Sequence, residues 1–236
     1  MGLNNINPVK AFTRILLFVV DTSSGMVGTV KAVNRAIESV ISSIKNASDE
    51  YPELNVQFKA AILEFWGENA IMSIPEDITT YKWKNLETKN GIAKFSVACK
   101  KLNEVLASGI IAYDPHPGII LIISPGFAVD GPVALNELKR NPRFMQAYKV
   151  AIGVGNFNST IVEKDTDNGV DVEFDAGNSQ DMKVLDEFTG IKEYAIDAFA
   201  PQSIHKVIRD ASFKAAQFGL EDKKFDRLLK KDSNDG

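Results

Sequence analysis

The chain has 236 residues, of which 44% are hydrophobic and 25% are charged, and its formal net charge is -4. This length and composition favour one large globular domain with a substantial core. The mild acidity, without a basic stretch, argues against a nucleic-acid partner, because phosphate binding requires clustered Lys and Arg.

The N-terminal residues lack the apolar core of a secretory signal peptide, and no apolar run is long enough for a membrane span. The single cysteine, Cys99, cannot form an internal disulfide. We therefore expect a cytoplasmic protein in a reducing compartment, without a membrane partner. Cys99 falls on a predicted helix, which favours a buried, inert thiol over a nucleophile.

Apolar strands and amphipathic helices alternate along the chain. Continuous apolar runs predict strands that are buried on both faces, at residues 14–20, 119–123 and 147–155. Helical spacing of apolar residues predicts five helices, at residues 27 to about 48, 93–110, 131–141, 182–190 and 200–218. The last strand is predicted at 193–197, and a long irregular connection at 78–91.

Two hairpins interrupt this alternation. Residues 55–66 and 69–75 read as two strands around Gly67-Glu68, and 156–178 reads as a surface hairpin around Asn168-Gly169. The second hairpin is the most acidic segment, with Glu163, Asp165, Asp167, Asp171, Glu173 and Asp175. It is either a solvated hairpin or an acidic docking surface for a basic partner.

These elements predict an α/β fold with a three-layer arrangement. A mostly parallel central sheet with one antiparallel edge strand would carry helices on both faces. The predicted domain covers residues 14–220, with an N-terminal extension (1–13) and a charged C-terminal tail (221–236). Ligands of such sheets gather at the carboxyl ends of the strands, so DTSSG (21–25) and SPG (124–126) are expected to converge there.

From residue 14 to about 218 the sequence resembles the von Willebrand factor type A (VWA) domain, through DTSSGM (21–26) and SPGFAVD (124–130). The resemblance implies a Rossmann-like fold and a metal-ion-dependent adhesion site (MIDAS). In that site an Asp-x-Ser-x-Ser turn, a Thr and a second Asp supply oxygen ligands to a cation such as Mg²⁺.

The match to that motif is partial. Asp21 and Ser23 occupy its first two positions, but Gly25 stands where the second serine belongs, as if it had exchanged with Ser24. Ala93 or Lys94 stands at the threonine position.

The later part of the motif is also altered. Ser124 and Pro125 replace the Thr and the Asp of the Thr-Asp-Gly turn, whereas Asp130 matches the final Asp of that stretch. The pattern of this stretch is similar to that of bacterial tellurite-resistance-type VWA proteins.

Loss of one carboxylate removes much of the attraction that offsets the dehydration of Mg²⁺. We therefore expect no cofactor. If Mg or Mn did bind, Asp21, Ser23, Ser24 and Ser124 would be its ligands. The competing expectation is that Asp21 accepts hydrogen bonds from its own turn and caps the helix predicted from Val27.

Enzymatic alternatives have weaker support. A haloacid-dehalogenase-like phosphatase would use Asp21 as its nucleophile, but the second Asp of that motif is replaced by Ser23. His116 and His205 lie in different contexts, which favours surface positions over a shared metal or catalytic role.

The predicted function is thus a non-enzymatic adaptor or scaffold that binds another protein, of VWA type with a degenerate MIDAS. The resemblance implies a bacterial stress-response or tellurite-resistance-type system. The predicted interaction face comprises Asp21, Ser23, Trp66, Trp83, Phe127 and Asp130, because large aromatic side chains favour protein interfaces. A working metal site that uses Ser24, and the phosphatase, remain the alternatives.

Overall fold

The computed structural model describes residues 12–50, 55–111, 113–127, 130–155, 160–164, 171–175, 179–191, 195–198 and 200–218. The predicted tail (221–236), nearly all of the N-terminal extension and the Asn168-Gly169 turn lie outside these residues.

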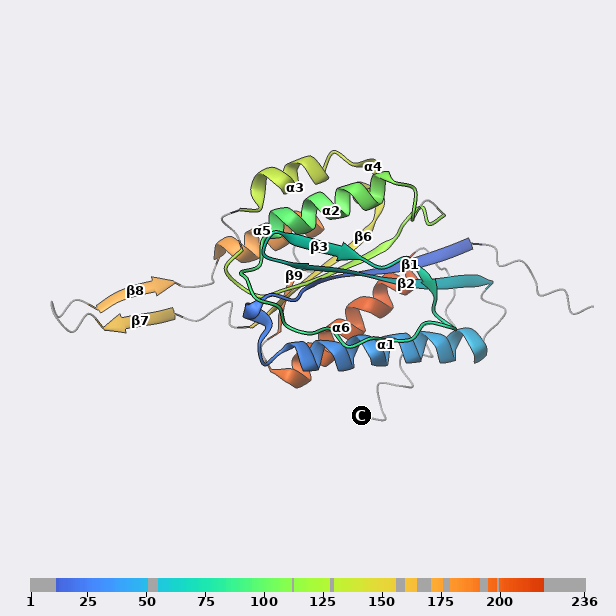
Figure 1. Cartoon of the computed structure of the whole chain (residues 1–236), viewed down its shortest axis with the longest axis horizontal. Coiled ribbons are helices and arrows are strands. Elements are labelled where there is room, and N and C mark those ends of the chain that lie inside the picture. Colours follow the sequence, from blue (N-terminus) through green and yellow to red (C-terminus); the bar gives the residue numbers. More distant parts are fainter. Residues whose placement is uncertain are drawn as a thin grey trace, which may run out of the picture.

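A seven-stranded sheet forms the middle layer (Figure 1). Its strands are β1 (Phe12–Asp21), β2 (Val56–Trp66), β3 (Asn69–Met72), β4 (Glu76–Asp77), β5 (Gly118–Ile123), β6 (Tyr148–Val154) and β9 (Ala195–Ala198). The order is β3-β2-β1-β5-β6-β9, with β4 also paired to β2. Only β3 and β4 run antiparallel to their neighbour, so the predicted mostly parallel sheet with an antiparallel edge is confirmed.

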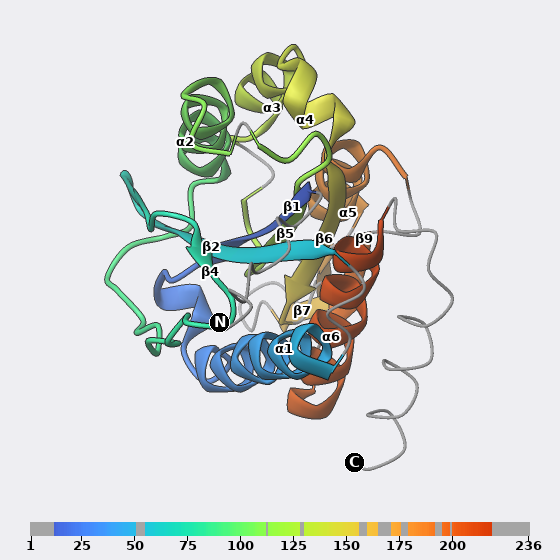
Figure 2. The ribbon, with the colours of Figure 1, turned by 90° about the vertical axis from the view of Figure 1, so that its right-hand side faces the viewer.

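Helices cover both faces of this sheet (Figure 2). One face carries α1 (Val30–Glu50) and α6 (Pro201–Gln217), and the other carries α2 (Phe95–Ala107), α3 (Pro132–Leu138), α4 (Pro142–Gln146) and α5 (Ser179–Thr189). Alternate residues of β1 enter the two cores: Leu16, Phe18 and Val20 face α1 and α6, whereas Ile15, Leu17 and Val19 face the other side. Both sets are buried, which explains the continuous apolar run in the sequence.

Some boundaries differ from the prediction. The first helix was expected from Val27, but Ser24–Met26 form a short 3₁₀ helix and α1 begins at Val30. Gly28, with φ of 89°, separates the two because only glycine adopts that backbone conformation readily. Two short elements, β4 and α4, were not predicted, because neither shows a periodic apolar pattern.

The predicted surface hairpin is confirmed for its strands. β7 (Thr160–Lys164) and β8 (Asp171–Asp175) pair antiparallel in a two-stranded sheet of their own. Figure 1 shows this sheet apart from the seven-stranded one. The side chains that make the hairpin acidic lie outside the described part of the structure, so its docking role stays a prediction.

Candidate functional site

The chain order reverses between β1 and β5, and the turns that leave these two strands meet. The backbone N–H of Ser124 donates to Oδ2 of Asp21 at 3.0 Å, and the Ser124 hydroxyl donates to the same oxygen. The predicted convergence of DTSSG and SPG at the carboxyl ends of the strands is thus confirmed. These turns form the candidate site.

Asp21 is fully buried, and both its carboxylate oxygens accept hydrogen bonds from the protein itself. Besides the two donors of Ser124, the Ser23 N–H donates to Oδ1 at 2.7 Å. The expected hydrogen bond within the turn is therefore confirmed. The expected cap on α1 is wrong: Ser23 caps the 3₁₀ helix instead, because its Oγ accepts from the Gly25 N–H at 3.3 Å.

Gly25 allows this close approach of the two turns. A Cβ added at Gly25 would lie 2.5 Å from Oγ and 3.0 Å from Cβ of Ser124. The Ser124 side chain thus fills the space that a serine at position 25 would need. The glycine at position 25 of the DTSSG turn therefore leaves room for the Ser124 side chain.

Ser24, the substitute metal ligand, is exposed and turned toward another loop. Its Oγ donates to the Gly91 carbonyl at 2.8 Å, and its backbone N–H donates to the same oxygen at 3.0 Å. The Lys89 N–H in turn donates to the Thr22 carbonyl at 2.6 Å. The end of the long 78–91 connection is thereby fastened to the DTSSG turn.

The remaining motif positions offer no hydroxyl beside Asp21. Ala93 is buried in the core, and Lys94 forms an ion pair with Glu68. Asp130 lies at the start of α2, where its carboxylate accepts from the backbone N–H groups of Phe95 (3.2 Å) and Ser96 (3.4 Å) and from the Ser96 hydroxyl (2.6 Å). Asp130 therefore serves as a helix cap.

The residues that are present fit a divalent cation poorly. Asp21, Ser23 and Ser124 are all buried, and their oxygens are engaged with one another or with backbone N–H groups. A cation would have to displace these bonds with only one carboxylate to compensate for its lost water. Within the described ranges, no three His, Cys, Asp or Glu side chains are placed to share a metal.

Two of the three predicted aromatic anchors do not face outward at the site. Phe127 is 1% exposed and packs against Phe95, with ring centroids 5.4 Å apart. Trp83 packs against the core on the α1 and α6 side, and its Nε1 donates to Asn85. The prediction that Phe127 offers a contact surface is wrong, because its ring is buried against Phe95 at the start of α2. Alanine at this position would open a cavity and cost about 3–5 kcal/mol of stability.

Trp66 is the aromatic residue that stays half-buried beside the site, at the end of β2. The Lys89 ammonium lies 3.8 Å from the centroid of its ring and also pairs with Glu64. The cation holds the ring against the 88–92 loop.

Two exposed apolar residues beside the site were missed by the sequence reasoning. Val27 is 69% exposed and follows the DTSSG turn, and Ile92 is 74% exposed and follows Gly91. The Gly67 N–H donates to the Ile92 carbonyl at 3.1 Å, which joins this loop to the β2–β3 turn. We call the surface formed by Ser24, Val27, Trp66 and Ile92 the DTSSG face. In the sequence, the one signal for this face was an apolar residue, Ile92, in a polar loop.

Other candidate residues lie elsewhere. His116 is exposed at the amino end of the sheet, with Nδ1 3.0 Å from the Gln146 carbonyl oxygen, and His205 lies on the first turns of α6. They do not come together. Cys99 is buried as predicted, and this burial raises the pKa of its thiol, which opposes thiolate formation.

Neither a protein-family model nor a curated protein sequence matches this chain. Solved structures do match. The vWF domain of the type V pili tip protein Mfa5 from Porphyromonas gingivalis aligns with a TM-score of 0.57 and 9% identity, over 91% of this chain and 98% of that chain. BatB from Bacteroides thetaiotaomicron aligns with a TM-score of 0.50 and 14% identity, over 87% and 99% of the two chains.

The pilus adhesin SpaC from Lactobacillus rhamnosus GG aligns with a TM-score of 0.60 and 10% identity, over 93% of this chain. This chain spans only 31% of that adhesin. These likenesses show a VWA fold, as the resemblance implied, and at such low identity they show the fold alone. Among the described helices, none combines the length and the apolar character that crossing a bilayer requires.

Proposed function

We propose that this chain is a non-enzymatic protein-interaction module that binds its partner through the DTSSG face without a divalent cation. One observation carries the proposal. The oxygens that a MIDAS would offer to a metal are buried and bonded to one another around Asp21, while Val27 and Ile92 beside them are exposed. The accessible groups at this site are thus apolar side chains, and the oxygens of a MIDAS are not accessible.

The composition of the DTSSG face supports a protein partner. Its apolar side chains are flanked by the ion pairs Lys89–Glu64 and Lys94–Glu68. Apolar contacts surrounded by charged groups are the usual anatomy of a protein interface. Trp66 is the side chain there most suited to be an energetic anchor, because it combines large area with few rotatable bonds.

The proposal also includes a cellular location and a biological system. A cytoplasmic location is supported only by the single cysteine, and a bacterial tellurite-resistance-type role only by the pattern at residues 124–130. The metal-dependent alternative would require Ser24 to leave the Gly91 carbonyl, and the phosphatase alternative would require a buried, fully bonded Asp21 to attack a phosphate.

The test places a photo-crosslinking residue at position 92 in the full chain within its native cells. We expect one dominant crosslinked protein, with the yield reduced several-fold by Val27→Asp. The matched control places the same residue at Ile110, an exposed apolar position after α2 at the other end of the sheet, and should not capture that protein.

The metal arm repeats the capture with purified components in EDTA and in Mg²⁺ or Mn²⁺. We expect equal yields, and no change in the unfolding midpoint at millimolar metal. A cation at a hundred times its dissociation constant would add about 2.7 kcal/mol of stability. Capture lost in EDTA, together with a midpoint shift that Asp21→Ala abolishes, would establish the metal-dependent alternative.

A further inference from the structure

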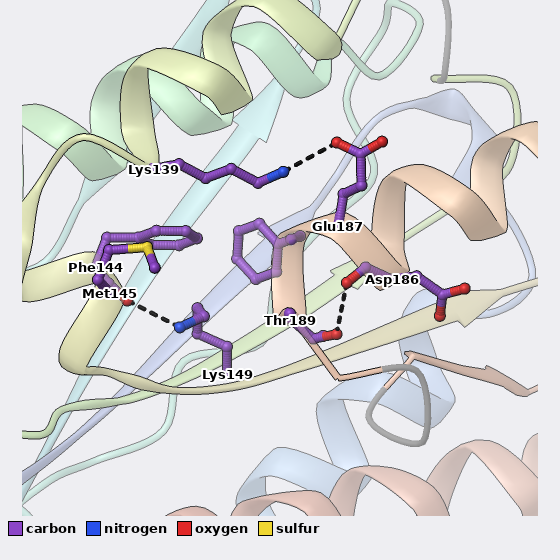
Figure 3. A pocket seen from close by; sticks show the side chains of 9 residues that line it. Lys139, Phe144, Met145, Lys149, Asp186, Glu187 and Thr189 are labelled. Atoms are coloured by element: carbon purple, nitrogen blue, oxygen red, sulfur yellow. Dashed lines mark hydrogen bonds and ion pairs between the residues drawn. The ribbon is translucent and has the colours of Figure 1, made fainter.

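A pocket of about 510 Å³ lies at the end of the sheet opposite the DTSSG face. It is an open pocket lined by the ends of α3 and α5, by α4 and by the start of β6 (Figure 3). Its lining residues are Lys139, Phe144, Met145, Lys149, Asp186, Glu187, Phe188, Thr189 and Gly190. Small-molecule sites have volumes of roughly 300–1,000 Å³ and mostly apolar walls, so this pocket is of suitable size.

Lys149 supplies a buried positive charge to this pocket. The residue is 9% exposed, and its Nζ donates to the carbonyls of Phe144 at 3.0 Å and Ala147 at 3.2 Å. The same Nζ lies 4.9 Å from the centroid of the Phe144 ring. An ammonium has three donors. The described residues provide these two acceptors and no carboxylate partner for it.

The acidic groups of the pocket are placed so that they do not neutralise Lys149. Glu187 pairs with Lys139 at 2.9 Å, across the gap between α5 and the end of α3. The Asp186 carboxylate is directed away from Lys149 (Figure 3). Among the described residues, no carboxylate therefore pairs with the Lys149 ammonium, which lies beside the buried rings of Phe144 and Phe188.

We propose that this pocket binds a small monocarboxylate with an apolar body. Its carboxylate would pair with Lys149, and its body would lie against Met145, above the buried rings of Phe144 and Phe188. Charge complementarity selects the ligand, because a buried ammonium without a counter-ion is costly and a carboxylate removes that cost. Burial also lowers the pKa of Lys149, as expected for an ammonium that no anion stabilises.

A purely structural role for Lys149 is the competing explanation. Its two acceptors are carbonyls at the end of α4, and a cation there completes the helix terminus. Such a role would give the pocket no preference for an anion. The two explanations therefore differ in ligand binding.

The test is a calorimetric titration of the full chain with 4-phenylbutyrate, with the neutral 4-phenylbutanamide as the matched ligand. We expect saturable binding of the acid, at least about tenfold tighter than that of the amide, as for a charge-assisted hydrogen bond. Amide N–H resonances of Thr189 and Gly190 should shift on binding. Lys149→Met should remove the preference for the acid, and Lys139→Met, at the rim, should retain it.

A second variant covers the case in which Lys149→Met fails to fold. Met145→Trp adds bulk at the mouth without touching Lys149, and it should abolish binding of the acid. Absence of saturable binding, equal binding of acid and amide, or binding by Met145→Trp would each overturn the proposal. The outcome is independent of the DTSSG face, since no residue is shared between the two surfaces.

Discussion

At the scale of the residue, the Gly25 and Ser124 pair determines what the site can hold. The two positions occupy one shared space, because a side chain at either leaves no room for one at the other. In this chain a serine at position 25 would fit only if the Ser124 side chain moved away from its place beside Asp21.

We expect Gly25→Ser to lower the free energy of unfolding by about 1–3 kcal/mol, because its Cβ would overlap the buried Ser124 side chain. Ser124→Gly should also destabilise, since it removes the hydroxyl bonded to Asp21. The double variant should be less destabilised than the sum of the two, because each change makes room for the other. Urea unfolding of the four proteins measures this coupling, and simple additivity would contradict the shared-space argument.

The sequence allowed part of this site to be predicted. Asp21 and Ser124 each follow a continuous apolar strand, and parallel strands end at one edge, so their meeting followed from the pattern. The burial of Phe127 did not follow. It depends on how the loop after β5 folds beneath α2, and loops carry no periodicity that would orient a side chain. The same reason explains why Ile92 was overlooked.

At the scale of the element, α2 depends on a residue from another loop. The residue before it, Lys94, provides no side-chain hydrogen bond to the helix, and Asp130 supplies the missing acceptor. The Asp at this position thus links the β5–α3 connection to the start of α2. In sequence this Asp resembled a fragment of a metal motif, although its contacts are those of a cap.

We expect Asp130→Ala to lower the free energy of unfolding by about 0.5–2 kcal/mol, the usual cost of losing a cap. Hydrogen exchange of the Phe95 and Ser96 amides should accelerate, because both lose their acceptor. Thermal or urea unfolding and exchange rates measure these effects. Glu137→Ala, an exposed acidic residue on α3, is the matched control and should change stability by less than about 0.5 kcal/mol. Equal losses of stability in Asp130→Ala and Glu137→Ala would contradict the capping role of Asp130.

The long helices were predictable, whereas the short helix α4 was not. Helices α1 and α6 show apolar stripes over several turns, and the end of α5 was marked by Gly190, whose φ of 76° closes the helix as expected. For α4 the sequence held a usable signal: Asn141 caps it by accepting from the Arg143 N–H, and Pro142 follows. A cap without an apolar stripe was too little to reveal a five-residue helix.

At the scale of the whole molecule, the two ends of the sheet are built differently. The carboxyl end carries the loops of the DTSSG face. The amino end is closed by Arg14, a buried residue near the start of β1, which donates to the carbonyls of His116 at 2.6 Å and Phe218 at 2.5 Å. Arg14 thus links the first strand, the loop before β5 and the residue after α6. The mostly parallel fold was predictable, but this long-range closure depends on pairings that a local pattern does not encode.

Breaking the Arg14–Asp114 pair tests how much this closure of the amino end contributes to the free energy of unfolding. Arg14 Nε lies 3.7 Å from Asp114 Oδ2, and both side chains are buried. Burial lowers the pKa of Arg14, and the Asp114 charge opposes that shift, so the carboxylate stabilises the buried guanidinium. We expect Arg14→Met to lower the free energy of unfolding by about 3 kcal/mol or more, since it leaves a buried carboxylate without its cation. Urea unfolding measures this loss.

Lys101→Met is the matched control for that experiment, because it also breaks an ion pair, with Glu104 at 3.0 Å, but at an exposed place on α2. Exposed pairs contribute about 0–1 kcal/mol, so its effect should be small. Asp114 keeps the backbone donors of Ile15 at 2.7 Å and His116 at 2.9 Å in the Arg14 variant. If those two bonds alone satisfied the carboxylate, Arg14→Met would cost no more than Lys101→Met. A large difference between the two variants would instead show that the cation holds the amino end of the sheet closed.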